Sequence, residues 1–241
     1  MTVAPSLLSV IIPVFNEQAT IGQVVEMVCR VDLSIDKEII IVDDGSTDST
    51  AEVIDSIKHR VTTVHTAQKN IGKGFAVRTG IGLSTGDIIL IQDADLELDP
   101  NEYSKLLEPI LSGRSSVVFG SRFLTNNSVP IFRYAANRGL TLLINLLFCV
   151  KLTDMGTAYK VFTREVADQL TLSGERFDVD PELACEIAKA GFTITEVPIT
   201  YRPRTRNEGK KIKWHDGFRA IRMIIGCRLG SNTTPRRGKG R

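Results

Sequence analysis

The chain of 241 residues has a formal net charge of +2, with 42% hydrophobic and 24% charged residues. This length and composition suit one globular domain with a substantial core, and apolar residues recur in short periodic runs that exclude disorder over most of the chain. The cysteines have no paired spacing and no neighbouring histidine cluster, which argues against a disulfide framework or a zinc site and favours reduced, cytosolic thiols. They are Cys29, Cys149, Cys185 and Cys227.

Charge is distributed unevenly along the chain. Residues 201–241 carry 13 Lys and Arg against 2 Asp and Glu, which leaves 17 against 26 for residues 1–200. A basic segment on an acidic body indicates binding to the phosphates of a ligand, a nucleic acid or an anionic membrane. The N-terminal segment lacks the basic stretch of a signal peptide. No segment offers about 18 consecutive apolar residues, so we expect no transmembrane helix.

Strand and helix patterns alternate over the first half of the chain. In chain order we predict a strand at 7–14, a helix at 17–30, a strand at 37–42, a helix at 48–58, a strand at 61–66, a helix at 74–83, a strand at 87–92, a helix at 100–111 and a strand at 116–120. Such alternation with short connections is typical of an α/β fold with a mainly parallel central sheet and helices on both faces.

The second half is less regular. We predict a long helix at 131–150, an apolar helix that begins near Pro181, a strand at 193–201, a basic loop at 202–213 and an amphipathic helix at 214–229. Residues 231–241 are rich in Gly, Arg and Lys, which predicts a basic flexible tail. We therefore expect one domain over residues 1–230, ending in the amphipathic helix, followed by this tail.

Three of the predicted strands end in polar clusters. In a mainly parallel sheet ligands gather at the carboxyl ends of the strands. The clusters are Phe15-Asn16-Glu17, Asp43-Asp44-Gly45-Ser46 and Asp93-Ala94-Asp95. We therefore expect the functional site at this edge of the sheet.

The Asp pairs in two of these clusters predict different ligands. Asp93 and Asp95 can direct both carboxylates to one point, which suits a hard divalent cation that also binds a diphosphate. An Asp-rich turn is the simpler interpretation of an isolated pair, but the neighbouring clusters favour a metal site. Asp48 alone can cap the next helix. Capping therefore does not explain Asp43 and Asp44, which can accept hydrogen bonds from a nucleobase or ribose.

Further motifs follow one another along the chain. The first four are Pro-Val-Phe-Asn-Glu at 13–17, Val-Asp-Asp-Gly-Ser-Thr-Asp at 42–48, Asn-Ile-Gly-Lys-Gly at 70–74 and Asp-Ala-Asp at 93–95. Together they resemble the family 2 glycosyltransferases, which have the Rossmann-like GT-A fold. Gly-Ser-Arg-Phe at 120–123, the run 153–162, Glu-Val-Pro-Ile at 196–199 and the run 204–212 resemble the dolichyl-phosphate mannose synthase branch. The resemblance covers roughly residues 7–228, and the order of the motifs argues against chance agreement.

The resemblance implies a polyprenyl-phosphate glycosyltransferase. Such an enzyme transfers a hexose, mannose or glucose, from a nucleotide-sugar such as GDP-mannose or UDP-glucose to a polyprenyl or dolichyl phosphate. The implied reaction inverts the sugar configuration and depends on Mg²⁺ or Mn²⁺. The implied location is peripheral, at the cytoplasmic face of a membrane, and the need for a small membrane-protein partner stays open.

The resemblance also implies roles for the residues that match its motifs. The implied donor-binding residues are Pro13, Phe15, Glu17, Asp43, Asp44, Lys73, Asp93, Ala94, Asp95, Arg204, Lys210 and Lys211, the last three as a clamp on the diphosphate. The implied metal ligands are Asp93, Asp95 and Glu97. The implied catalytic residues are Asp93, Asp95, Arg122 and Arg133, of which the two arginines would face the acceptor phosphate. The role of Asn137 stays open.

The residue content agrees with a phosphate acceptor. A phosphate monoester with a second pKa of about 6 is already nucleophilic at neutral pH, so no general base is required, and His59, His65 and His215 fit ordinary surface positions. The main alternative is a hydroxyl acceptor in polysaccharide or glycolipid synthesis. It would require a base, for which Asp180 is a minor candidate, since the dipole of a helix start also favours a carboxylate there. A nucleic-acid-binding module ranks low, because the acidic strand ends would repel nucleic acid.

Two predicted helices combine apolar and basic residues. Either helix could simply pack on the core, but basic amphipathic helices also bind membrane interfaces. The basic residues are Arg133 and Arg138 in the helix at 131–150, and Arg219, Arg222 and Arg228 in the helix at 214–229. A lipid-linked acceptor favours a membrane surface as a partner of these helices.

Overall fold

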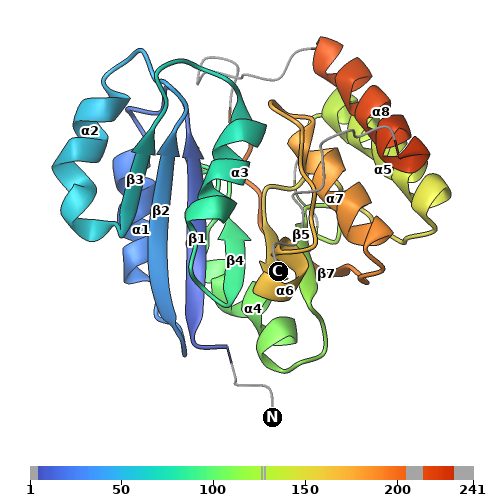
Figure 1. Ribbon diagram of the computed structural model, residues 1–241, viewed down its shortest axis with the longest axis horizontal. Coiled ribbons are helices and arrows are strands. Elements are labelled where there is room, and N and C mark those ends of the chain that lie inside the picture. Colours follow the sequence, from blue (N-terminus) through green and yellow to red (C-terminus); the bar gives the residue numbers. More distant parts are fainter. Residues whose placement is uncertain (1–4, 126, 128, 205–213, 231–241) are drawn as a thin grey trace, which may run out of the picture.

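A computed structural model describes residues 5–125, 127, 129–204 and 214–230, with side chains in the last segment from residue 217. A seven-stranded sheet lies at its centre, in the strand order β3-β2-β1-β4-β6-β5-β7 (Figure 1). The strands are β1 (Leu7–Val14), β2 (Asp36–Asp43), β3 (Thr63–Thr66), β4 (Ile88–Ile91), β5 (Val117–Ser121), β6 (Lys160–Thr163) and β7 (Thr195–Pro198). The helices are α1 (Ile21–Arg30), α2 (Thr50–Ile57), α3 (Lys73–Leu83), α4 (Tyr103–Leu111), α5 (Ile131–Phe148), α6 (Arg164–Ala167), α7 (Val179–Lys189) and α8 (Trp214–Leu229), with short 3₁₀ turns η1 (Lys58–Arg60) and η2 (Pro100–Glu102).

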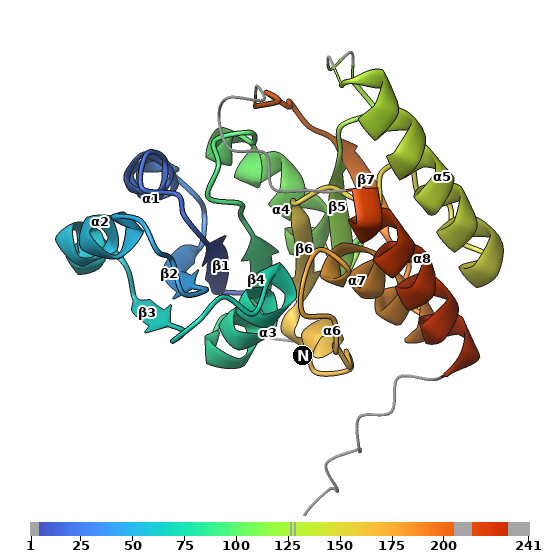
Figure 2. The ribbon, with the colours of Figure 1, turned by 90° about the horizontal axis from the view of Figure 1, so that it is seen from above.

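The sheet is mainly parallel. Strand β1 pairs in parallel with β2 and β4, and β2 pairs in parallel with β3. Strand β7 runs parallel to β5, whereas β6 is antiparallel to both of its neighbours, β4 and β5. Helices cover both faces of the sheet (Figure 2). The predicted α/β class and sheet arrangement are therefore confirmed.

Strand β6 is not among the elements predicted from the sequence. It has four residues and begins with Lys160, so its apolar pattern is too short and too polar to stand out. In the fold it joins the middle of the sheet, with Val161 and Phe162 buried in the two core clusters. Tertiary packing decides the conformation of this segment more than its local pattern does.

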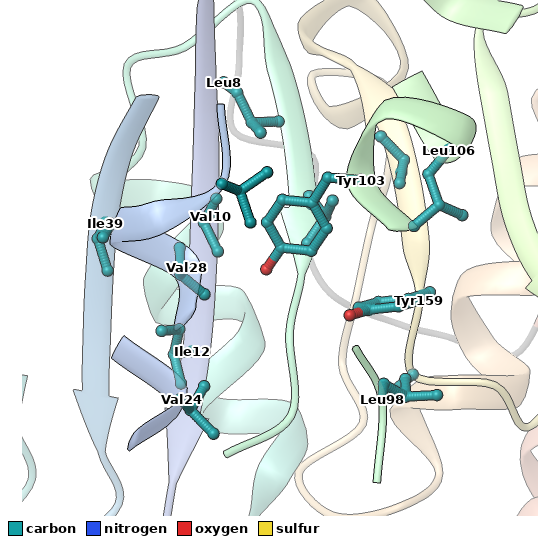
Figure 3. Close-up of a cluster of buried hydrophobic side chains, with 14 of the residues drawn as sticks. Leu8, Val10, Ile12, Val24, Val28, Ile39, Leu98, Tyr103, Leu106 and Tyr159 are labelled. Atoms are coloured by element: carbon teal, nitrogen blue, oxygen red, sulfur yellow. The ribbon is translucent and has the colours of Figure 1, made fainter. Parts of the chain in front are cut away.

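The core lies on both faces of the sheet, because alternate residues of a strand point to opposite faces. Val10 and Ile12 of β1 belong to the cluster that packs under α1 and α4 (Figure 3). Ile11 belongs to the second cluster, to which α3 and α7 contribute. Burial on two faces explains why β1 reads as an almost continuous apolar run.

Helices α5 and α8 lie side by side on the second face (Figures 1 and 2). Each has a buried side in the core cluster, through Ile144 of α5 and Ile224 of α8. Each also leaves large apolar side chains exposed: Ile131, Phe132, Leu142 and Leu146 on α5, and Phe218, Ile221, Ile225 and Leu229 on α8. Among the described residues, no helix has the length and apolar character needed to cross a bilayer.

Candidate active site

The ends of β1 and β2 are held together by the turn at Asn16. This residue adopts a left-handed conformation with φ 52°, which Asn tolerates better than most residues. Its backbone N–H donates to Ser46 Oγ (2.9 Å), and its Oδ1 accepts from the backbone N–H of Thr47 (2.8 Å). The turn delays the start of α1 to Ile21, later than predicted, and places the first two polar clusters next to each other.

Asp44 fixes the loop that leads into α3. Its carboxylate accepts hydrogen bonds from the backbone N–H groups of Ile71 (2.9 Å) and Gly72 (2.6 Å) and from Asn70 Nδ2 (3.0 Å). Burial raises the pKa of Asp44, and these donors oppose that effect. Asp43 accepts from the backbone N–H and the hydroxyl of Ser46. Both carboxylates are almost fully buried and hold the loops around them in place, and their contact with a nucleoside stays a prediction.

The chain before Asp93 is held by a buried glutamine. The Oε1 atom of Gln92 accepts from the hydroxyls of Tyr103 (2.8 Å) and Tyr159 (2.9 Å), the two rings labelled in Figure 3. Its Nε2 donates to the backbone carbonyl of Asp93 (2.8 Å). Ala94 turns its side chain into the core cluster, so any contact it makes with a donor comes from its backbone.

Asp93 and Asp95 lie together after β4, as predicted. Burial raises the pKa of Asp95 to about 7, with further contributions from the charges of Asp93 and Glu97. No group of three candidate metal ligands occurs within the described parts of the chain. Glu97 lies close enough for its charge to act on Asp95, and its place among the metal ligands stays a prediction. Its carboxylate accepts from the Tyr201 hydroxyl (3.0 Å) and the Arg204 backbone N–H (2.8 Å).

Arg204 reaches the donor side of the site. Its guanidinium forms an ion pair with Glu17 (2.7 Å) and donates from Nε to the backbone carbonyl of Asp95 (2.8 Å). The structure thus brings together three predicted donor-binding residues that are far apart in the sequence. Pro13 and Phe15 lie at the end of β1 beside them. Lys210 and Lys211, the rest of the predicted clamp, lie outside the described residues.

Lys73 and Asp180 connect α3 and α7 to the end of β4. The Lys73 Nζ lies 2.9 Å from Asp93 Oδ1 and 3.5 Å from Asp180 Oδ2. The other Asp180 oxygen lies 2.7 Å from the Nζ of Lys160. Burial alone would raise the pKa of Asp180, but the two ammonium groups outweigh it, and the pKa is lowered. Asp180 is therefore an ionised, doubly paired carboxylate.

Arg122 and Arg133 meet around Tyr201. Arg122 forms a two-pronged ion pair with buried Asp154, from Nε (2.7 Å) and Nη2 (2.8 Å), and its guanidinium lies 5.1 Å from the centre of the Tyr201 ring. Arg133 donates from Nη1 to the Tyr201 hydroxyl (3.2 Å). The buried Nε of Arg133 has no hydrogen-bond partner within the described parts of the chain. An anionic ligand would supply such a partner.

Several residues of the site escaped sequence reasoning. Asp154 fixes Arg122, and Asn137 donates to the same carboxylate (2.8 Å), which gives this asparagine a defined place. Tyr201 links both arginines to Glu97. Asp154 and Lys160 both lie in the motif at 153–162, which was the only signal for them. Their roles depend on partners that are distant in the chain and cannot be seen in a local pattern.

The chain is similar to a family of sugar-transferring proteins and to individual members of it. The family model described as Glycosyl transferase family 2 matches residues 9–171. The chain is 29% identical over 229 residues to the low-salt glycan biosynthesis hexosyltransferase Agl6 of Haloferax volcanii, a match that covers 92% of this chain and 54% of that protein. It is 28% identical to an undecaprenyl-phosphate 4-deoxy-4-formamido-L-arabinose transferase of Salmonella choleraesuis, over 95% of this chain and 68% of that protein.

Two further similarities concern chain length and fold. An uncharacterized protein of Methanocaldococcus jannaschii is 30% identical, over 90% of both chains. The glucosyl-3-phosphoglycerate synthase of Mycobacterium tuberculosis, solved with Mn²⁺ and UDP-glucose, superposes with a TM-score of 0.70 at 22% identity, over 98% of this chain and 82% of that chain. The present chain spans only about half the length of Agl6.

The fold and the family match define the class of this protein. It is a glycosyltransferase with an α/β fold like that of the solved GT-A enzymes. The chain belongs to glycosyl transferase family 2.

Proposed function

We propose that this enzyme transfers a hexose from a nucleotide-sugar to a polyprenyl phosphate. The observation that carries the proposal is the position of Arg122 and Arg133, which meet around Tyr201 beside the carboxylates that follow β4. Arginine binds phosphate through paired hydrogen bonds, so this pair suits a phosphate next to the donor. The similarity to an enzyme named for undecaprenyl phosphate supports the same acceptor class.

The donor end of the site suits a nucleotide diphosphate with a divalent cation. Mg²⁺ commonly binds through one or two carboxylates together with substrate phosphates, and Asp93 and Asp95 supply two oxygen-donor side chains at one strand end. Burial, together with the charges of Asp93 and Glu97, raises the pKa of Asp95, and a bound cation would stabilise its ionised form. When bound, Mg²⁺ or Mn²⁺ would neutralise the leaving diphosphate. Lys73 and Arg204 add positive charge on either side.

The acceptor phosphate supplies its own nucleophile. Its oxygen attacks the anomeric carbon while the bond to the diphosphate breaks, and this single displacement inverts the configuration at that carbon. No proton has to be removed, since the phosphate is ionised at neutral pH. Asp180, the candidate base for a hydroxyl acceptor, is a weak base here because both its oxygens face ammonium groups and its pKa is lowered.

A membrane surface suits the exposed faces of α5 and α8. Their large apolar side chains occur together with the exposed arginines Arg138, Arg219, Arg222 and Arg228. Apolar groups beside cationic ones favour the headgroup region of an anionic leaflet. We propose that the enzyme lies at the cytoplasmic face of such a membrane, in line with its similarity to an enzyme named for undecaprenyl phosphate. A small membrane-protein partner could share this surface.

A two-by-two assay tests the acceptor class. The purified protein is incubated with labelled GDP-mannose or UDP-glucose and Mg²⁺, and with either a polyprenyl phosphate or the polyprenol of the same length. We expect labelled lipid with the phosphate and none with the alcohol. Transfer to the alcohol would instead support a hydroxyl acceptor. Retention of RNA or DNA without any sugar transfer would support the nucleic-acid alternative.

A further inference from the structure

A fully buried lysine lies behind the donor site. Lys160, the first residue of β6, has no exposed surface. Its ammonium lies 2.7 Å from Asp180 Oδ1, donates to the backbone carbonyl of Thr157, and lies 5.3 Å from the centre of the Phe119 ring. An ammonium removed from water is costly unless it is paired. An apolar side chain of the same length could fill this space without that cost. The charge of Lys160 is instead paired with the carboxylate of Asp180.

That partner connects Lys160 to the donor site. Asp180 lies between two lysines, and its second oxygen faces the Nζ of Lys73 at 3.5 Å. Lys73 in turn reaches Asp93 at 2.9 Å. Four groups of alternating charge therefore run from the centre of the sheet through the start of α7 and the start of α3 to the end of β4.

The four charged groups differ in how tightly the fold holds them. Lys160 is enclosed on all sides in a central strand, whereas Lys73 keeps 14% of its side-chain surface exposed. A lysine side chain has four flexible bonds and loses considerable freedom when it is held in one place. Asp180 restrains Lys73, and Lys160 restrains Asp180. The buried lysine also adds one positive charge close to a site that must accept a negatively charged diphosphate.

We propose that Lys160 is a positioning residue for the donor site, which acts through Asp180 to hold Lys73 beside Asp93. This inference rests on the proposed function, because it assumes that Lys73 and Asp93 meet the diphosphate of a nucleotide-sugar. Neither Lys160 nor Asp180 has to touch the donor in this arrangement. The effect of removing either charge should therefore be confined to ligands that carry the diphosphate.

Binding measurements on the full chain test this chain of contacts. Lys160→Met keeps the length of the side chain and removes its charge, and Asp180→Asn removes the charge of the next member. Calorimetry with Mg²⁺ compares the affinities for GDP-mannose and UDP-glucose with those for guanosine and uridine. We expect Lys160→Met to weaken binding of the preferred nucleotide-sugar by about tenfold or more, with nucleoside binding unchanged. Lys37→Met is the matched control, because Lys37 is half-buried, binds the carbonyls of Cys29 and Val31, and lies near the start of β2, at the opposite end of the strand from Asp43.

The double variant separates positioning from general damage to the fold. If Lys160 acts through Asp180, then Lys160→Met adds no further loss of affinity to Asp180→Asn. The double variant also lacks an unpaired buried charge, so it provides a readout if Lys160→Met alone does not fold. The inference would be overturned if the losses of nucleotide-sugar affinity in the two single variants multiplied in the double variant. It would also be overturned by an equal loss of nucleoside affinity, or by unchanged affinity in the folded variants. Wild-type protein that binds no nucleotide-sugar would overturn the proposed function together with it.

Discussion

Asp95 gives the site a pH dependence that can be derived from its surroundings. Burial and the charges of Asp93 and Glu97 raise its pKa to about 7, compared with about 3.9 in an unfolded chain. Between these values the folded protein binds more protons than the unfolded protein does. The contribution of Asp95 to stability is therefore complete below about pH 4 and is lost as the pH rises through about 7.

This sign leads to a prediction for Asp95→Asn. In EDTA, the free energy of unfolding of the wild type should fall between about pH 5 and about pH 7.5, and the variant should fall less, because the amide does not titrate. Urea unfolding at the two pH values measures the difference. Asp99→Asn, which removes a nearby carboxylate that caps η2, is the control for the loss of a negative charge. Parallel slopes for Asp95→Asn and the wild type would contradict the assignment.

Arg133 allows a test of the acceptor side. Its buried Nε lacks a partner within the described residues, and we expect an acceptor phosphate to supply one. Arg133→Gln should raise the KM for a short, water-soluble prenyl phosphate by about tenfold or more, since a charged hydrogen bond contributes about 1.5–3 kcal/mol. The KM for the nucleotide-sugar should stay unchanged. Arg138→Gln, on the same helix but exposed, should leave both values unchanged; an equal effect of both variants would argue against a specific phosphate contact.

At the scale of elements, the turn before α3 is built for one residue type. Gly72 has φ 135°, and a Cβ there would lie 2.3 Å from the backbone carbonyl oxygen of Glu175. Its N–H also donates to Asp44. Gly72→Ala should destabilise the protein by about 1–3 kcal/mol and weaken donor binding, because Lys73 follows directly. Thermal unfolding and donor calorimetry measure the two effects.

Gly82→Ala is the matched control for that substitution. Gly82 lies in α3, and a Cβ there would meet nothing within 4 Å. Alanine in a helix interior is favoured over glycine by about 0.5–1 kcal/mol, so this variant should be as stable as the wild type or more stable. If both glycine variants behave alike, the strain assigned to Gly72 is absent.

The strands differ in how clearly their sequence patterns predict them. All five strands of the first half were predicted. Four of them, β1, β2, β4 and β5, are buried on both faces and have continuous apolar runs, whereas the edge strand β3 is partly exposed. Strand β6 was missed, because a four-residue strand that starts with a lysine has no such pattern. The polar clusters at the strand ends were predicted because each directly follows one of these apolar runs. Contacts such as Asp180 with Lys160 depend on the strand order, which local patterns do not define.

At the scale of the whole molecule, α5 and α8 give one side of the protein an apolar and basic surface. We predict reversible binding to anionic vesicles and release by high salt, which screens charge attraction. Replacing Arg219, Arg222 and Arg228 by Gln should reduce vesicle sedimentation and turnover on long-chain acceptors.

The control for this prediction is a short, water-soluble prenyl phosphate, which needs no membrane. Its turnover should be almost the same in the triple variant and the wild type. Unchanged sedimentation of the triple variant would mean that α8 serves only the core, to which it contributes Ile224 and Cys227.

The antiparallel direction of β6 restricts how the loop before it can change in length. Lys160 is paired with Ile91 of β4 and Phe119 of β5, so the strand brings its first residue, not its last, to the edge where β4 ends. A slip of one residue would turn every side chain of the strand to the opposite face. Lys160 would then face the aliphatic cluster under α1 and α4, and Val161 would face Asp180. Insertions and deletions between α5 and β6 are therefore tolerated only where the loop accommodates them without shifting β6. In a library of variants with different loop lengths at residues 149–159, only members that keep β6 in its original register with β4 and β5 should be active.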